Sequence, residues 1–77
     1  MDLDWYLATN RPAWDRLAQL AATARRSPRQ LSPAEVDELI SLYQRTSAQL
    51  SFARRHFGDP ALTAELNRLV ATANAAV

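Results

Sequence analysis

The sequence predicts an all-α fold, an antiparallel up-down-up three-helix bundle with a short additional helix at the N-terminus. Three observations carry this prediction. Apolar residues make up 48% of 77 residues, with one glycine and no cysteine, which is typical of a folded helical protein rather than a disordered tail or a disulfide scaffold. These apolar residues recur at three- and four-residue steps. Capping sequences with proline divide the chain at residues 32–35 and 58–60, and short connections make consecutive helices antiparallel.

The first two expected elements are a short helix over residues 2–9 and a helix over residues 11–26. Asp2 and Asp4 would complement the dipole of the short helix. Its apolar side chains could cover one end of the core: Leu3, Trp5 or Tyr6, and Leu7. The second helix should fray before Pro28, because the residue that precedes a proline disfavours helical geometry. Its buried face is predicted to consist of Trp14, Leu17, Leu20 or Ala21, and Ala24.

The third element is a long central helix over residues 33–57. Ser32 is its predicted N-cap, with Pro33 at the first helical position and Glu35 completing a capping box. Gly58 can adopt the left-handed conformation that ends a helix. The apolar stripe of this helix is predicted to contain Val36, Leu39, Tyr43, Leu50, Ala53 and Phe57, with Ile40, Leu42 and Ser47 widening it.

The last helix is expected over residues 60–77, with Asp59 as N-cap and Pro60 at its first position. Its apolar face is predicted to be Leu62, Leu66, Leu69, Val70 and Ala73. The central helix would be longer than this one, so the leading segment is expected to fill the gap near Phe57. No stop signal precedes Val77, and we therefore expect the helix to continue into a segment that the sequence lacks.

Composition and charge restrict the possible functions. No apolar run approaches the roughly 20 residues that span a bilayer, and the N-terminus is acidic where a signal peptide is basic. The formal net charge is +1 and all nine cationic side chains are arginine. The chain therefore lacks the global positive field that gathers nucleic acid, and no nucleic-acid partner is expected.

Two groups of basic residues stand near predicted helix ends. Arg25, Arg26 and Arg29 form the denser group, and they could either offset the negative end of their own helix or face anionic lipid. The second group consists of Arg54, Arg55 and His56, and the helix dipole alone explains why basic residues occur in this last helical turn.

The middle of the central helix is polar. Two interpretations are open: hydroxyl groups that bond back to their own helix, or an exposed surface that accepts another protein or a second copy of the chain. The residues of the predicted partner surface are Gln44, Ser47, Gln49 and Ser51.

No enzymatic site is predicted, and neither a metal nor a cofactor is expected. Glu35, Asp37 and Glu38 lie at a helix start, where acidic residues are common on a solvated face. His56 is the sole histidine and has no ligand spacing around it. No nucleophile, base and pocket converge in the pattern.

Three segments together resemble the N-terminal cytoplasmic region of the stage II sporulation protein M family, as found in actinobacterial members. They are RPAWDRL (residues 11–17), LSPAEVDELISLYQRTSAQLSFAR (31–54) and DPALTAELNRLVATANAAV (59–77). The resemblance implies that a multi-helix membrane domain follows and that this segment lies on the cytoplasmic side of the cell membrane. It transfers no catalytic or ligand-binding residue to these positions.

The sequence therefore favours a non-enzymatic interaction and assembly domain of a multi-pass membrane protein. Its expected partners are other membrane or cytoplasmic proteins, with self-association as a further expectation. The alternative is a free-standing small helical homodimer that acts as a regulator or an antitoxin-like partner.

Overall fold

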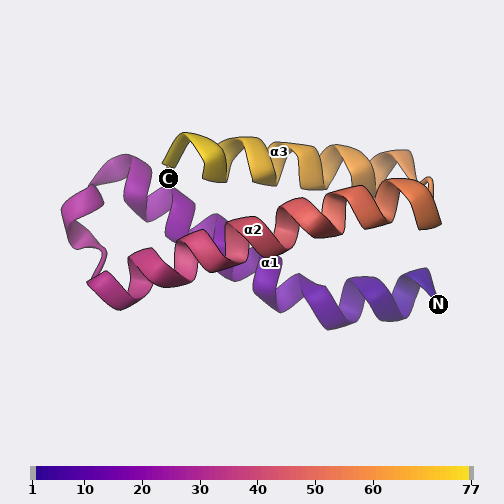
Figure 1. Cartoon of the computed structure of the whole chain (residues 1–77), viewed down its shortest axis with the longest axis horizontal. Helices are drawn as coiled ribbons and strands as arrows, with labels where there is room; N and C mark the ends of the chain where they lie inside the picture. The colour runs from indigo at the N-terminus through magenta and orange to yellow at the C-terminus, as the bar shows by residue number, and fades with distance from the viewer. Residues whose placement is uncertain (1, 77) are drawn as a thin grey trace.

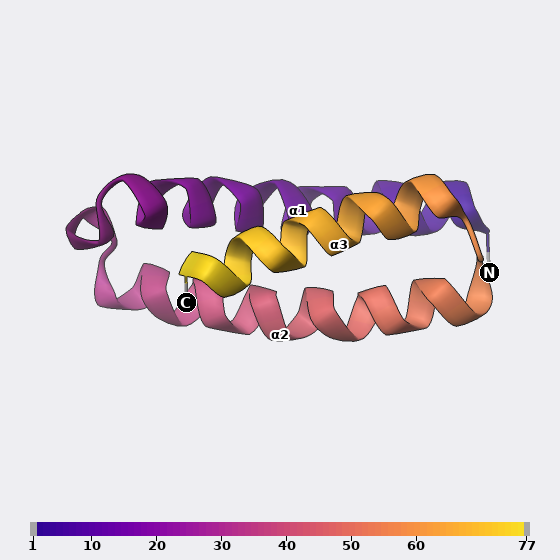
Figure 2. The same ribbon diagram turned by 90° about the horizontal axis from the view of Figure 1, so that it is seen from above.

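The computed structural model describes residues 2–76, which form three α-helices and one short 3-10 helix, with no strand in this range. The elements are α1 (Leu3–Arg26), η1 (Pro28–Gln30), α2 (Pro33–His56) and α3 (Pro60–Ala76). In Figures 1 and 2, α1 runs toward η1, α2 runs back beside it, and α3 runs again toward the η1 end. The body measures 39 × 19 × 15 Å. The prediction of an all-α fold is confirmed.

The predicted separation of a short leading helix from a second helix is wrong, because α1 is continuous from Leu3 to Arg26. Pro12 lies inside α1 on its exposed side, and it leaves the carbonyl of Ala8 without its usual helical donor. The buried face continues past this point through Tyr6, Asn10 and Trp14 at steps of four residues. Packing along that face outweighs the local cost of the proline. The sequence pattern did not reveal that the buried face of α1 is continuous, because Asn10 is a polar residue at a buried position of that face.

The N-terminal part of α1 covers the core near the end of α2, as predicted. The ring centroid of Tyr6 lies 5.0 Å from that of Phe57 and 5.6 Å from that of Phe52. Leu3 and Leu7 are partly buried against the same cluster. Trp5 is different, because 57% of its surface is exposed.

The caps of α2 and α3 form as the sequence predicts. The amide of Glu35 donates to Ser32 Oγ at 3.1 Å, and the amide of Ser32 donates to the Glu35 carboxylate at 3.0 Å. Asp59 accepts hydrogen bonds from the amides of Ala61 and Leu62 at 2.9 and 3.2 Å. Each cap satisfies amides that have no partner within their helix.

Gly58 ends α2 with a φ of +58°, and its amide donates to the carbonyl of Ala53 at 3.2 Å. We expect Gly58→Ala to lower the free energy of unfolding by about 1–2 kcal/mol, because an alanine pays the steric cost of the left-handed region. No atom lies within 4 Å of the added Cβ, so a clash contributes nothing. Urea unfolding followed by circular dichroism measures the change. An unchanged midpoint would show that the turn relaxes to another conformation.

The core consists of two clusters along the bundle, and Leu69 of α3 packs against both. The cluster nearer the N-terminus of α1 contains Tyr6, Trp14, Leu50, Ala53, Leu62 and Leu66. The cluster nearer η1 contains Leu17, Leu20, Ala21, Ala24, Leu39 and Ala73. The predicted inward faces of α1 and α3 therefore lie in the core, with Leu69 and Val70 partly buried.

One part of the predicted stripe on α2 is not buried. Val36 and Ile40 are 39% and 36% exposed. The hydroxyl of Tyr43 donates to Asn74 at 3.1 Å, which fixes the level where the end of α3 meets α2. Val36 lies seven residues closer to η1, roughly 10 Å farther along the helix axis. In Figure 2 the described part of α3 stops short of the N-terminal end of α2, and Val36 is the fourth residue of α2.

Candidate functional site

The predicted basic cluster lies at the η1 end of the bundle. Arg25 and Arg26 form the last turn of α1, and Arg29 belongs to η1. All three side chains are exposed, and none forms an ion pair with any residue in the range 2–76. Ala22, Arg25 and Arg26 line a shallow hollow of about 490 Å³. The two arginines on α1 also lie where positive charge stabilises a helix C-terminus, so the helix dipole accounts for part of this arrangement.

The second basic group lies at the opposite end of α2, where Arg54 and His56 contact nearby residues. Arg54 donates to Asn67 of α3 at 3.0 Å. The ring of His56 stacks on Phe52 with centroids 3.9 Å apart, and its Nδ1 lies 3.1 Å from the Phe52 carbonyl oxygen. Arg55, the remaining member of this group, is exposed and forms no ion pair within residues 2–76.

The predicted partner surface on α2 does not form one patch. Gln44 and Ser51 are exposed on the outer side, whereas Gln49 points to α1 and bonds to Trp14 and Asn10. Ser47 is half-buried, and its Oγ has no hydrogen-bond partner within residues 2–76. The hydroxyl of the buried Thr46 has none there either, so neither hydroxyl bonds back to its own helix.

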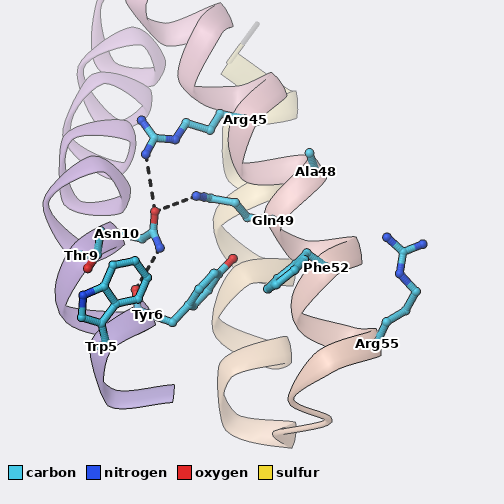
Figure 3. A pocket seen from close by; sticks show the side chains of 9 residues that line it. All are labelled: Trp5, Tyr6, Thr9, Asn10, Arg45, Ala48, Gln49, Phe52 and Arg55. Atoms are coloured by element: carbon cyan, nitrogen blue, oxygen red, sulfur yellow. Dashed lines mark hydrogen bonds between the residues drawn. The ribbon is translucent and has the colours of Figure 1, made fainter. Parts of the chain in front are cut away.

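A chain of partly buried polar groups joins α1 to α2, and Figure 3 shows the part of it formed by Tyr6, Asn10 and Gln49. The Nε1 group of Trp14 donates to Gln49 Oε1 at 2.8 Å, and Gln49 Nε2 donates to Asn10 Oδ1 at 2.8 Å. Asn10 Nδ2 then donates to the carbonyl of Tyr6 at 2.9 Å. Each amide is used as donor and acceptor, which offsets the cost of burying it. This connection fixes the register of the two helices.

Beside this polar chain an open groove of about 580 Å³ runs between the N-terminal half of α1 and the C-terminal half of α2. Its lining residues are Trp5, Tyr6, Thr9, Asn10, Arg45, Ala48, Gln49, Phe52 and Arg55. In Figure 3 the indole of Trp5 stands on the α1 wall, and Phe52 and Arg55 extend from the α2 wall. We call this feature the aromatic groove. Sequence reasoning missed it because Trp5 or Tyr6 was expected to cover one end of the core, and no local pattern placed Phe52 opposite them.

Ion pairs hold the helices together elsewhere. Arg16 donates to both carboxylate oxygens of Glu38 at 2.8 Å and lies 3.7 Å from Glu35. The hydrogen bond from Arg16 holds the pKa of Glu38 below its usual value. Arg11 pairs with Glu65 of α3, and its guanidinium lies 5.6 Å from the Trp14 ring centroid. No comparable pair bridges the aromatic groove among the described residues.

Tyr6 lines the groove, and its side chain is buried. Burial raises the pKa of the Tyr6 hydroxyl, and the nearby positive charge of Arg45 opposes this increase. The Tyr6 hydroxyl has no hydrogen-bond partner within the described part of the chain. Within residues 2–76, no three histidine, cysteine or acidic side chains come together in a way that could bind a metal ion. The lining of the groove supplies aromatic surface from Trp5, Tyr6 and Phe52, and positive charge from Arg45 and Arg55.

Comparisons with known proteins identify one relationship. A family model described as a domain of unknown function (DUF8413) matches residues 4–77. No curated protein and no solved structure matches the chain. Within the described range, none of the helices is both long and apolar enough to cross a bilayer.

Proposed function

We propose that this chain, which belongs to the DUF8413 family of domains of unknown function, is a non-enzymatic helical interaction and assembly module. In this proposal it lies at the cytoplasmic face of the cell membrane, as a domain of a multi-pass protein similar to stage II sporulation protein M. Its basic end, defined by Arg25, Arg26 and Arg29, faces anionic lipid. Gln44 and Ser51, on the outer side of α2, stay open to other proteins.

The observation that carries the proposal is the state of the three arginines at the η1 end. All are exposed, and none is neutralised by a carboxylate within residues 2–76. A guanidinium group binds phosphate in a planar, two-pronged geometry, so it suits a lipid headgroup. Each such residue near an anionic surface contributes about 1 kcal/mol.

The proposal treats the three helices as one up-down-up bundle. The directions of the ribbons in Figures 1 and 2 support this order, since α3 runs toward the end that carries η1. A segment that continued from α3 would then leave the bundle on the side of the basic cluster. That arrangement allows the arginines and a following membrane segment to reach the same bilayer.

The triple variant Arg25→Ala, Arg26→Ala, Arg29→Ala is expected to bind anionic vesicles about a hundredfold more weakly than the wild type, because three contributions of about 1 kcal/mol each are lost. The reason is the loss of three phosphate contacts at one end of the bundle. Co-sedimentation with vesicles of phosphatidylcholine and phosphatidylglycerol measures the affinity. Because these contacts are solvent-exposed, wild-type binding should also fall as salt is raised.

The matched control is Arg54→Ala, Arg68→Glu. It lowers the formal net charge of +1 by the same three units, at exposed positions away from both η1 and the aromatic groove. This control should keep most of the wild-type affinity. Equal losses in the triple variant and the control would indicate attraction by net charge alone. No binding by the wild type, or equal binding by the wild type and the first variant, would refute the proposed orientation.

A further inference from the structure

The aromatic groove is open, and no side chain within residues 2–76 fills it. Trp5 is the most exposed of the large apolar side chains in the described range, at 57%. It stands at the rim of an open groove of about 580 Å³ instead of filling it. A tryptophan that faces solvent beside an aromatic wall is typical of an interaction site, because tryptophan is enriched among the residues that dominate interface energies.

Positive charge on the α2 wall of the groove is not compensated within residues 2–76. Arg45 and Arg55 line the groove, are exposed, and form no ion pair in this range. The one polar contact of Arg45 in that range is a long hydrogen bond of 3.5 Å to Asn10 Oδ1. A partner that fits the groove should therefore bring negative charge.

Negative charge accompanies Trp5 itself. Asp2 and Asp4 lie in the cap and first turn of α1, both are exposed, and neither is ion-paired within the described range. The Asp2 carboxylate accepts a hydrogen bond from the backbone amide of Asp4 at 3.4 Å. The start of α1 thus carries an exposed aromatic residue and two carboxylates without ion pairs in residues 2–76, while the α2 wall of the groove carries two guanidinium groups without ion pairs there.

We propose that the aromatic groove is the interface of a homodimer with two-fold symmetry. Trp5 of each copy enters the groove of the other and packs near Phe52. The acidic first turn of α1, with Asp2 and Asp4, faces Arg45 and Arg55 of the partner copy. Two-fold interfaces use the same patch on both subunits, so a residue that contacts a second residue is matched by the reciprocal contact.

Charge complementarity selects a second copy over another partner. An acidic partner would neutralise Arg45 and Arg55 but would approach Asp2 and Asp4, and like charges at an interface are unfavourable. A basic partner would neutralise Asp2 and Asp4 but would approach Arg45 and Arg55, which carry the same charge as the partner. A second copy satisfies both groups at once. The dimer does not depend on attachment to a membrane, so its test is independent of the vesicle experiment.

Sedimentation equilibrium of the 77-residue chain is expected to show a monomer–dimer equilibrium. Trp5→Ser should weaken dimerisation by about tenfold or more, since the variant removes the proposed anchor. Circular dichroism should match the wild type, because Trp5 contributes little to the core. The matched control is Val36→Ser, which removes an apolar side chain that is 39% exposed but lies outside the groove. This control should dimerise as the wild type does.

Exchanging the charges tests the geometry directly. An acidic variant carries Arg45→Glu and Arg55→Glu, and a basic variant carries Asp2→Asn and Asp4→Arg, with asparagine retained as an N-cap residue. Each variant alone should be monomeric, because like charges then meet in both halves of the interface. A mixture of the two variants should form a heterodimer, since opposite charges then meet in both halves of the interface again.

The proposal is overturned if the wild type stays monomeric up to about 1 mM. It is also overturned if Trp5→Ser dimerises as tightly as the wild type, or if the charge variants fail to recover dimerisation when mixed. Recovery in the mixture but in neither variant alone supports the two-fold arrangement and is hard to obtain from any other surface.

Discussion

Trp14→Ala is expected to lower the free energy of unfolding by about 3–5 kcal/mol, as large truncations of buried aromatic residues do. Trp14 is 2% exposed and packs with Tyr6 and Leu66 in the cluster nearer the N-terminus. The variant also leaves Gln49 Oε1 without its donor. A domain of this size has a total stability of about 4–12 kcal/mol, so the change removes much of it.

Urea unfolding followed by far-ultraviolet circular dichroism measures this loss. The control is Trp14→Phe, which keeps most of the apolar volume but cannot donate to Gln49. It should cost about 1–3 kcal/mol, the penalty of a buried acceptor without a partner. If Trp14→Ala costs less than the control, the side chain is not the centre of that cluster.

Local sequence signals predicted the caps of α2 and α3 and the end of α2 well, because these depend on a few adjacent residues. The capping box of Ser32 and Glu35, the cap at Asp59 and the left-handed Gly58 all form as expected. Each is determined by contacts within five residues along the chain. Periodicity also identified the inward faces of α1 after Pro12 and of α3.

The errors arose where contacts between distant segments decide the outcome. Asn10 looks like a polar break in the apolar pattern, but Gln49, 39 positions later, supplies a partner that allows it to be buried. For the same reason Gln49 was assigned to an outer surface. Val36 fits the periodic stripe, yet it is 39% exposed, about two turns of α2 beyond the level at which Tyr43 meets Asn74.

Two surfaces illustrate how much of a candidate site the sequence reveals. The basic end could be predicted, because Arg25, Arg26 and Arg29 are close in sequence and lie beside a helix end. The aromatic groove could not, because its walls come from helices whose lining residues are about 40 positions apart. No local pattern distinguishes Trp5, which faces solvent, from Tyr6, which is buried.

Pro12→Ala is expected to raise the free energy of unfolding by about 2 kcal/mol. In a helix interior proline is about 3 kcal/mol less favourable than alanine, since it removes a hydrogen bond and crowds the carbonyl four residues earlier. Part of this gain is offset, because proline also restricts the unfolded chain by about 0.4–1 kcal/mol. Pro12 is exposed, so the variant loses little packing.

The chain supplies matched controls in its other helical prolines. Pro33 and Pro60 occupy the first positions of α2 and α3, where a missing amide hydrogen has no helical acceptor to lose. Pro33→Ala and Pro60→Ala should therefore change stability by less than about 1 kcal/mol in either direction. Thermal and urea unfolding of the three variants compare them directly. If Pro12→Ala were no more stable than the wild type, α1 would not be helical through this position in solution, and the N-terminal wall of the aromatic groove would have to be reconsidered.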